Sequence, residues 1–259
     1  MAKLGSRDAQ LRARRSLAGV DSRDFSEALA RGLRIIESFD RDHRRMTLAE
    51  TARAVDLPRA TVRRSLSTLV HLGYMTLDGR EYQLASRVLG LATTYLGAGP
   101  SRVLQAACEQ LCADVGHVCS VAVLDGDAAV MIARAAPNQL LAAGVGVGHR
   151  LPALRTSLGR ALLAGLDDTA LEERLATAAP NDRRRLRAAV HAARNDGHAY
   201  ADSEVTPGFR SIAVPLHRWD GRMIAAINLG GSGADPDMLR GPLLGALRHT
   251  AAELSAQLI

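Results

Sequence analysis

The sequence has only three cysteines and no long apolar run, and each of these scarcities excludes a class of protein. Cys108, Cys112 and Cys119 are odd in number and are spaced neither as a disulfide framework nor as the CxxC pairs of zinc sites. We expect small buried apolar residues there, with no metal and no cofactor. No apolar stretch reaches the roughly 18 residues of a membrane span. The charged N-terminus has no apolar core of a secretory signal, so a soluble, cytoplasmic chain without a membrane partner is predicted.

The composition is otherwise that of an ordinary globular protein. Hydrophobic residues make up 47% and charged residues 23%, which excludes a mainly disordered, collagen-like or coiled-coil chain. A length of 259 residues favours two domains over one.

Lysine is nearly absent, because Lys3 is the only one, and arginine carries almost all of the positive charge. Residues 1–85 hold sixteen Lys and Arg against eleven Asp and Glu, a charge of +5, which leaves +1 for residues 86–259. A codon bias toward arginine would enrich both parts alike, so the clustering indicates a function. Since the arginine fork fits phosphate groups and guanine edges, the first third is predicted to bind nucleic acid.

Two short helices joined by a tight turn are predicted within this basic part. They follow an amphipathic helix at Phe25–Phe39. Thr47 and Glu50 have the spacing of a capping box, so a helix begins there. Pro58 cannot continue that helix but fits the first turn of the next one, which runs to about Leu72. This arrangement, with exposed polar groups on the second helix, is typical of a helix-turn-helix.

The outward face of the second helix carries arginine, threonine and serine, which can contact phosphates or read base edges. The candidate DNA-binding residues on it are Arg59, Thr61, Arg63, Arg64, Ser65 and Thr68. Asp78-Gly79-Arg80 between two β-prone segments indicates a hairpin, and this predicts a wing with Arg80 as a phosphate contact at its tip. A three-helix bundle whose arginines form only a solvated face is the alternative.

Beyond residue 85 the pattern changes to a linker helix and then to an alternation of strands and helices. Strands are predicted at Val118–Leu124, Ala128–Arg134, Leu140–Val147, His198–Ser203, Phe209–Leu216 and Met223–Leu229. Helices are predicted at Val103–Val115, Arg155–Leu163, Thr169–Ala178, Asp182–Asn195 and Pro236–Leu258. This order predicts an α+β domain with a mainly antiparallel sheet. The predicted domains are a flexible basic arm at 1–24, a winged helix-turn-helix at 25–85, a linker helix at 86–100 and a second domain at 101–259.

Several motifs resemble the IclR family of transcriptional regulators, from about residue 26 to the end of the chain. In the first third they are Ile35-Ile36-Glu37-Ser38-Phe39, Met46-Thr47-Leu48-Ala49-Glu50 and Leu57-Pro58-Arg59-Ala60-Thr61-Val62. Later they are Thr156-Ser157-Leu158-Gly159-Arg160, Gly208-Phe209-Arg210-Ser211 and Ala225-Ala226-Ile227-Asn228. The sequence around Phe39-Asp40 and Arg44-Arg45-Met46-Thr47 is similar to that of the subgroup that regulates protocatechuate, 4-hydroxybenzoate and β-ketoadipate catabolism.

The resemblance implies a homodimer, often a dimer of dimers, that binds a pseudo-palindromic double-stranded operator through its winged helices. It also implies a GAF-like effector-binding domain for a small organic acid, aromatic or dicarboxylic. Carried over motif by motif, the effector pocket is lined by Leu140, Ser157, Leu158, Phe209, Ser211, Asn228 and Gly230.

Arg155 stands where members of that family commonly have a small residue or histidine. Our hypothesis is that Arg155 pairs with the acid, with the hydroxyl groups of Thr156 and Ser157 as further donors. The alternative is that Arg155 faces solvent or a partner subunit.

Catalysis is the rival class of function. The sequence has no GxSxG, P-loop, HExxH or dinucleotide-binding GxGxxG pattern, so no enzyme is predicted. Asp202 and Glu204 are two residues apart and can be interpreted as an acid pair, although an acidic loop patch is favoured. A nucleic-acid-associated hydrolase and a ligand-independent DNA-binding protein remain as alternatives.

Overall fold

The computed structural model describes residues 25–40, 42–97, 99–137 and 145–257 of the chain. The chain forms two compact units, which divide between Thr94 and Tyr95. The basic arm proposed at 1–24 lies outside the described residues. No helix in the described part is long and apolar enough to cross a membrane.

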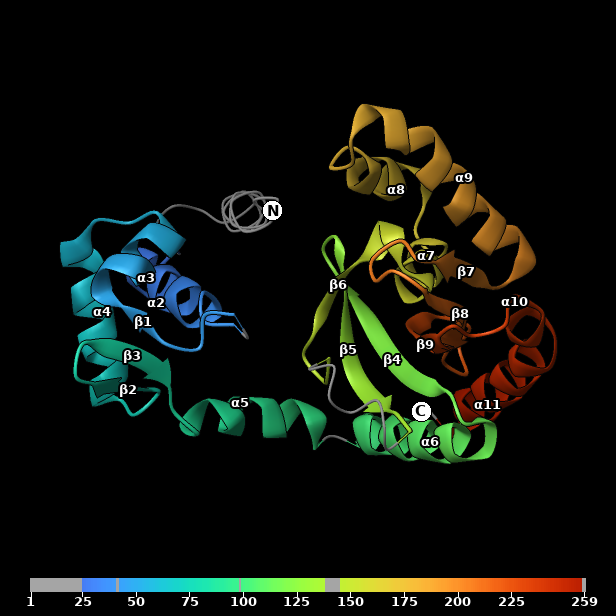
Figure 1. The fold of residues 1–259 in the computed structure, drawn as a ribbon, viewed down its shortest axis with the longest axis horizontal. Coiled ribbons are helices and arrows are strands. Elements are labelled where there is room, and N and C mark those ends of the chain that lie inside the picture. Colours follow the sequence, from blue (N-terminus) through green and yellow to red (C-terminus); the bar gives the residue numbers. More distant parts are fainter. Residues whose placement is uncertain (1–24, 41, 98, 138–144, 258–259) are drawn as a thin grey trace. The chain divides into compact units, whose positions relative to one another are not determined.

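In the described part of the N-terminal unit, three helices pack against a small antiparallel sheet (Figure 1). The helices are α2 (Glu27–Glu37), α3 (Leu48–Val55) and α4 (Arg59–His71), and the strands are β1 (Met46–Thr47), β2 (Met75–Asp78) and β3 (Glu81–Leu84). Ile35, Val62 and Leu66 are fully buried in its core. The apolar face predicted for α4 is confirmed, but the one predicted for α2 is partly wrong, because Leu29 and Leu33 are exposed and Ile35 is buried instead.

The turn between α3 and α4 has the features of a helix-turn-helix. The predicted capping box is present, because the Glu50 amide donates to Thr47 Oγ1 at 3.4 Å and the Thr47 amide donates to Glu50 Oε2 at 2.8 Å. Hydrogen bonds from the Thr47 amide and the Thr47 hydroxyl to the Glu50 carboxylate lower the pKa of that carboxyl. Asp56 ends α3 in the left-handed region, with φ of 51°, and the Leu57 amide returns to the Ala52 carbonyl at 3.1 Å. The chain therefore reverses within three residues and begins α4 directly after Pro58.

The wing is a hairpin of β2 and β3, with Met75 opposite Leu84 and Asp78 opposite Glu81. Gly79 in its turn has φ of +59°, which glycine adopts without strain. The two-residue strand β1, which the sequence pattern did not predict, pairs with β3. Two residues are too few to give an alternating pattern, so the sequence held no signal for it.

The second unit is built on one six-stranded antiparallel sheet in the order β6-β5-β4-β9-β8-β7. Its strands are β4 (Val118–Asp125), β5 (Ala128–Ala135), β6 (Arg150–Pro152), β7 (Ala199–Asp202), β8 (Phe209–His217) and β9 (Met223–Ser232). The helices here and at the unit boundary are α5 (Arg87–Leu96), α6 (Gly99–Val115), α7 (Ser157–Leu163), α8 (Asp168–Leu175), α9 (Pro180–Asp196), α10 (Pro236–Met238) and α11 (Leu244–Gln257). The predicted α+β class, with an antiparallel sheet in the C-terminal part, is confirmed.

The helices of this unit cover the two faces of the sheet in different ways (Figure 1). Helices α6 and α11 lie on one face over the larger apolar core, where all three cysteines are free and buried. A hydrogen bond with Cys108, followed by burial, raises the pKa of the Cys119 thiol far above its ordinary value. Helix α7 lies on the other face against alanines, which leave little side-chain bulk beneath it. These are Ala122, Ala129, Ala213 and Ala226.

Two predicted elements of this unit are wrong in detail. Of the strand expected at Leu140–Val147, residues 138–144 lie outside the described part, and residues 145–147 are not a strand. A turn in which Gly148 has φ of +83° follows, and the edge strand β6 comes after it. The final helix expected at Pro236–Leu258 is interrupted by a π-helical turn at Leu239–Leu243. Pro242 in that turn has no amide hydrogen to donate, which breaks the regular α-helical pattern.

Candidate functional site

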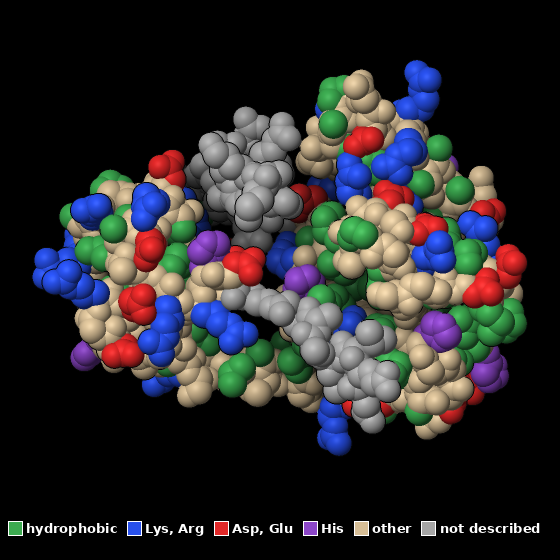
Figure 2. Space-filling view, viewed as in Figure 1, with side chains coloured by type: hydrophobic (Ala, Val, Ile, Leu, Met, Phe, Trp, Pro, Cys, Tyr) green, Lys and Arg blue, Asp and Glu red, His purple; other side chains and the backbone are tan. Residues whose placement is uncertain are grey.

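The first candidate site is the outer face of α4. Arg59, Arg63, Arg64 and Thr68 are exposed, whereas Thr61 and Ser65 are partly buried. Figure 2 shows arginine side chains on the edge of the N-terminal unit over which α3 and α4 run in Figure 1. The opposite face of α4 packs into the core through Val62, Leu66 and Leu69, so the orientation of the helix is fixed.

The arginines of this face have no carboxylate partner among the residues that the structure describes. Elsewhere in the unit Arg31 pairs with Glu27 at 3.1 Å, and Arg45 pairs with Asp78 at 3.2 Å. Arg59, Arg63, Arg64 and the exposed Arg80 in the wing turn make no such pair. Their guanidinium groups are therefore available to phosphates or bases.

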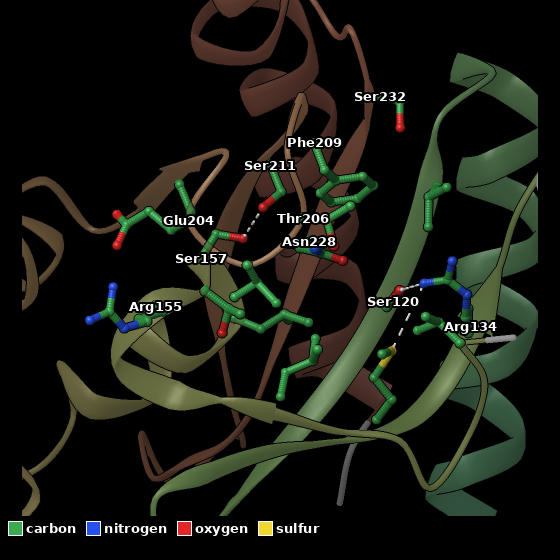
Figure 3. A pocket seen from close by; sticks show the side chains of 18 residues that line it. Ser120, Arg134, Arg155, Ser157, Glu204, Thr206, Phe209, Ser211, Asn228 and Ser232 are labelled. Atoms are coloured by element: carbon green, nitrogen blue, oxygen red, sulfur yellow. Dashed lines mark hydrogen bonds between the residues drawn. The ribbon is translucent and has the colours of Figure 1, made fainter. Parts of the chain in front are cut away.

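The second candidate site is a cavity of about 180 Å³ in the C-terminal unit (Figure 3). It lies between the sheet, the start of α7 and the loop that joins β7 to β8. Its apolar lining is Val118, Met131, Val145, Leu151, Leu158, Ala201, Val205 and Phe209. Its polar lining is Ser120, Arg134, Arg155, Thr156, Ser157, Glu204, Thr206, Ser211, Asn228 and Ser232.

A polar row crosses three neighbouring strands at the floor of the cavity. Arg134 on β5 is opposite Ser120 on β4, and Ser120 is opposite Asn228 on β9. Residues opposite each other in an antiparallel pair have their Cβ atoms about 5 Å apart and point to the same face. The sheet register therefore brings together three residues that are far apart in sequence.

Arg134 is a partly buried cation without a carboxylate partner among the described residues. Its guanidinium donates to Ser120 Oγ at 3.2 Å and approaches Met131 Sδ at 3.9 Å. Burial is the largest influence on it and lowers the pKa of the Arg134 guanidinium. A cation in these surroundings favours an anion beside it, since pairing recovers part of the lost hydration.

The other buried polar groups of the lining are a pair of serines and one asparagine. The hydroxyl groups of Ser157 and Ser211 form a hydrogen bond to each other at 2.7 Å, and both residues are buried. Asn228 is 6% exposed, and its Oδ1 atom is buried without a hydrogen-bond partner. A buried amide oxygen without a donor is rare in folded proteins.

Seven of the nine predicted effector residues line the cavity: Arg155, Thr156, Ser157, Leu158, Phe209, Ser211 and Asn228. Leu140 lies outside the described residues. Gly230 is not part of the lining, but it faces Ser211 across the sheet, and a Cβ atom there would lie 2.7 Å from Ser211 Cβ.

Arg155 and Thr156 are engaged within the protein. Arg155 pairs with Asp182 at 2.5 Å. The Thr156 hydroxyl accepts from the Gly159 amide at 3.1 Å, so it caps α7. Of the two arginines in the lining, Arg134 is therefore the one without a carboxylate.

A buried ion pair supports the loop between β7 and β8, which is one wall of the cavity. Arg160, whose side chain is 5% exposed, donates to Glu204 Oε1 at 2.5 Å and to the carbonyl groups of Leu154 and Tyr200. Asp202 instead pairs with Arg210 at 2.9 Å, and the pKa of its carboxyl is lowered by Ser203 and Arg210. Asp202 and Glu204 thus have separate cationic partners. This arrangement favours the interpretation as an acidic loop patch over that as an acid pair.

Arg134, Ser120 and Glu204 were not predicted as site residues. Arg134 did carry a signal, because it ends an apolar strand segment, Val130-Met131-Ile132-Ala133, in which a charged residue is unexpected. Glu204 was singled out only with Asp202, as an acid pair or an acidic loop patch. Ser120 carried no signal, since serine is common at any exposed position.

A winged helix-turn-helix joined to a domain with an acid-compatible cavity defines a DNA-binding regulator that responds to a small molecule. Residues 28–79 match the IclR helix-turn-helix domain, and residues 101–256 match the bacterial transcriptional regulator IclR C-terminal domain. The chain belongs to the IclR family, and it is an effector-controlled transcriptional regulator.

The chain is similar to named regulatory proteins and to solved members of the family. The chain is 38% identical to the Pca regulon regulatory protein of Pseudomonas putida, covering 84% of this chain and 78% of the relative. It is 32% identical to the p-hydroxybenzoate hydroxylase transcriptional activator of Acinetobacter baylyi, covering 91% and 93%. A crystal structure of an IclR homolog from Microbacterium hydrocarbonoxydans, complexed with 4-hydroxybenzoate, is 25% identical with a TM-score of 0.76 and covers 90% of this chain and 99% of that one.

Proposed function

We propose that the effector is a small aromatic carboxylic acid bound in the cavity of the C-terminal unit, and that α4 and the wing bind the operator. The observation that carries the proposal is Arg134, a partly buried cation that lines the cavity with no carboxylate beside it. The carboxylate of a bound acid would pair with the Arg134 guanidinium, and this ion pair would offset the cost of removing the carboxylate from water.

The remaining lining suits an aromatic ring. Phe209 and Leu158 provide apolar surface in the lining. The volume of about 180 Å³ exceeds the roughly 150 Å³ of an apolar cavity that takes up benzene. The similarity to a p-hydroxybenzoate hydroxylase transcriptional activator, and to an IclR homolog complexed with 4-hydroxybenzoate, supports the same class of ligand.

Benzoate derivatives are expected to stabilise the purified protein against heat. A ligand present at about 100 times its Kd adds about 2.7 kcal/mol to the free energy of unfolding, which corresponds to several degrees in Tm. The measurement is a thermal-shift series with mono- and dihydroxybenzoates, with neutral benzamides of the same shape as controls. If no aromatic acid raises Tm, the chain is better described as a ligand-independent DNA-binding protein.

For the operator, the proposed contacts are Arg59, Thr61, Arg63, Arg64, Ser65 and Thr68 on α4, with Arg80 of the wing on phosphate. A homodimer or a dimer of dimers binds two half-sites of a pseudo-palindrome, about 34 Å or one helical turn apart. Such a protein acts on chromosomal DNA and therefore in the cytoplasm.

Replacing Arg63 with glutamine is expected to weaken operator binding, while Arg31→Gln serves as the matched control. Arg63 is an exposed arginine without an ion pair on α4, whereas Arg31 lies on α2 and pairs with Glu27. A lost phosphate contact makes the fall of log K with log salt less steep by about 0.9, and it weakens binding to all DNA sequences. A lost base contact costs about 1–3 kcal/mol on the operator alone. Fluorescence anisotropy at several salt concentrations distinguishes these results, and equal affinity of both variants would contradict the α4 interface.

A further inference from the structure

Helix α6 holds the backbone of Arg134 through the side chain of Gln105. The Arg134 amide donates to Gln105 Oε1 at 3.0 Å, and Gln105 Nε2 donates to the Arg134 carbonyl at 3.0 Å. A side-chain amide offers the same kinds of donor and acceptor as a peptide group, so Gln105 takes the place that a neighbouring strand would occupy. Arg134 therefore lines the cavity with its side chain while its backbone is bound to a helix.

The edge of β5 explains why a side chain is needed there. On the side of β5 away from β4, backbone pairing in the described part of the chain reaches only to Met131. The Met131 amide donates to the His149 carbonyl at 3.0 Å, and the Gly148 amide donates to the Met131 carbonyl at 2.7 Å. Beyond this point α6 packs against β5, whose end lies over that helix in Figure 1. Gln105 Nε2 also donates to Glu109 Oε1 at 2.8 Å, which fixes the orientation of the amide.

The same face of α6 is hydrogen-bonded to the linker helix α5. Ser101 lies four residues before Gln105, so both side chains share one face of α6. The Ser101 hydroxyl donates at 3.3 Å to the carbonyl of Tyr95, in the last turn of α5. The division between the two units falls within α5, between Thr94 and Tyr95. Hydrogen bonds and one helix therefore connect Arg134 to the element in which the two units meet along the chain.

We infer that Gln105 is the positioning residue through which a carboxylate bound at Arg134 acts on α6 and α5. The inference rests on the proposed function and adds how binding of the acid reaches the part of the chain that binds DNA. A ligand changes an equilibrium only through contacts that differ between two arrangements of the protein. The ion pair at Arg134 is such a contact, and the two hydrogen bonds of Gln105 make the Arg134 backbone and α6 move together.

The variant Gln105→Leu removes both hydrogen bonds and keeps a side chain of similar size. Gln110→Leu is the matched control, because Gln110 is an exposed residue of the same helix. Its Nε2 atom donates to Asp114 Oδ1 at 2.8 Å, four residues later, as Gln105 does to Glu109. The two variants lose the same kind of contact along the helix, but only Gln105→Leu also releases the backbone of Arg134.

The measured quantity is the ratio of the operator Kd with saturating acid to the operator Kd without it. The acid is the hydroxybenzoate that raises Tm most in the thermal-shift series, and the DNA is a duplex that the full-length protein selects from a random-sequence library. In the unmodified protein we expect this ratio to differ from one by at least about fivefold, within the usual range of allosteric coupling. In Gln105→Leu we expect a ratio within about twofold of one, whereas Gln110→Leu keeps the full effect.

The two affinities taken one at a time are expected to change little in Gln105→Leu. Arg134 keeps its hydrogen bond to Ser120 Oγ at 3.2 Å, so the Kd of the acid should stay within about threefold of that of the unmodified protein. The operator Kd without acid should also stay within about threefold, because α4 and the wing are unaltered. A residue with only a structural role would weaken both affinities and leave the ratio as it is.

Hydrogen exchange gives a second readout that requires no DNA. Saturating acid is expected to slow the exchange of the backbone amides of residues 99–110 in α6 at least about twofold in the unmodified protein, and to leave them unchanged in Gln105→Leu. Thermal unfolding reports whether the variant folds. If it does not, the unmodified protein decides alone, and equal exchange of α6 with and without acid would contradict the inference.

Failure of this inference is distinguishable from failure of the proposed function. An unchanged ratio in Gln105→Leu, or a ratio of one in an unmodified protein that does bind the acid, overturns the role of Gln105 but leaves aromatic-acid binding in place. A loss of acid affinity of about 30-fold or more in Gln105→Leu also overturns it, because Gln105 would then serve binding itself. If none of the acids binds, both the inference and the proposed effector fail.

Discussion

Replacing Arg134 with glutamine is expected to weaken aromatic-acid binding at least 30-fold, while operator binding without effector stays unchanged. The carboxylate would enter a cavity whose unpaired cation has been removed, and truncating one partner of a buried charge pair costs about 2–5 kcal/mol. Calorimetry with 4-hydroxybenzoate measures the loss, and an operator-binding assay confirms that the N-terminal unit is intact.

The stability of this variant gives an independent readout. Burial lowers the pKa of Arg134, which means that the charged form is disfavoured in the folded state relative to the unfolded one. A neutral glutamine removes that penalty, so the free energy of unfolding is expected to stay equal or rise. Arg150→Gln, on the neighbouring strand β6, is the control, since Arg150 pairs with Asp125 and is not part of the cavity lining. Unchanged acid affinity in Arg134→Gln would place the carboxylate elsewhere, with Arg155 as the next candidate.

Glu204→Gln is expected to destabilise the C-terminal unit by about 3 kcal/mol, the lower end of the range for breaking a buried ion pair. The change leaves the guanidinium of Arg160, 5% exposed, without an anion and with only the carbonyl groups of Leu154 and Tyr200. Urea denaturation followed by circular dichroism measures the effect. The variant is also expected to bind aromatic acids less tightly, because Val205 and Thr206 follow Glu204 directly and line the cavity.

The control for this prediction is Glu172→Gln. Glu172 forms a pair of 2.6 Å with Arg187, but their side chains are 52% and 39% exposed. Water therefore screens the interaction, and little change in stability is expected. The same small effect in Glu204→Gln would mean that the pair with Arg160 contributes no more than a surface pair.

The sequence was sufficient to predict those elements whose structure depends on residues close to each other along the chain. The capping box at Thr47 and Glu50, the helix beginning after Pro58 and the hairpin around Gly79 all follow from local hydrogen bonds and backbone preferences. The DNA-binding face of α4 could be proposed for the same reason, since the residues that face the core also determine which ones face outward.

The effector cavity depends on contacts that the sequence does not display. Arg134, Ser120 and Asn228 are adjacent only through the pairing of three strands, and a register shift between Val121 and Ala122 contributes to that alignment. Arg155 was proposed as the partner of the acid because it lies beside the start of a helix. In the structure its guanidinium instead pairs with Asp182, 27 residues later. Local patterns identify charged residues, whereas the partner of each charge is decided by the tertiary fold.

Two kinds of structure line the cavity, namely the polar row on β5, β4 and β9 and the loop between β7 and β8, and substitutions in them should affect ligand binding differently. The side chains of the polar row project from the central strands of a hydrogen-bonded sheet, whereas Val205 and Thr206 come from a connecting loop. Substitutions in the sheet should therefore alter which acid is recognised, because they change a rigidly held template. Substitutions in the loop should instead alter how quickly the acid leaves, so that selectivity and dwell time can be tuned separately.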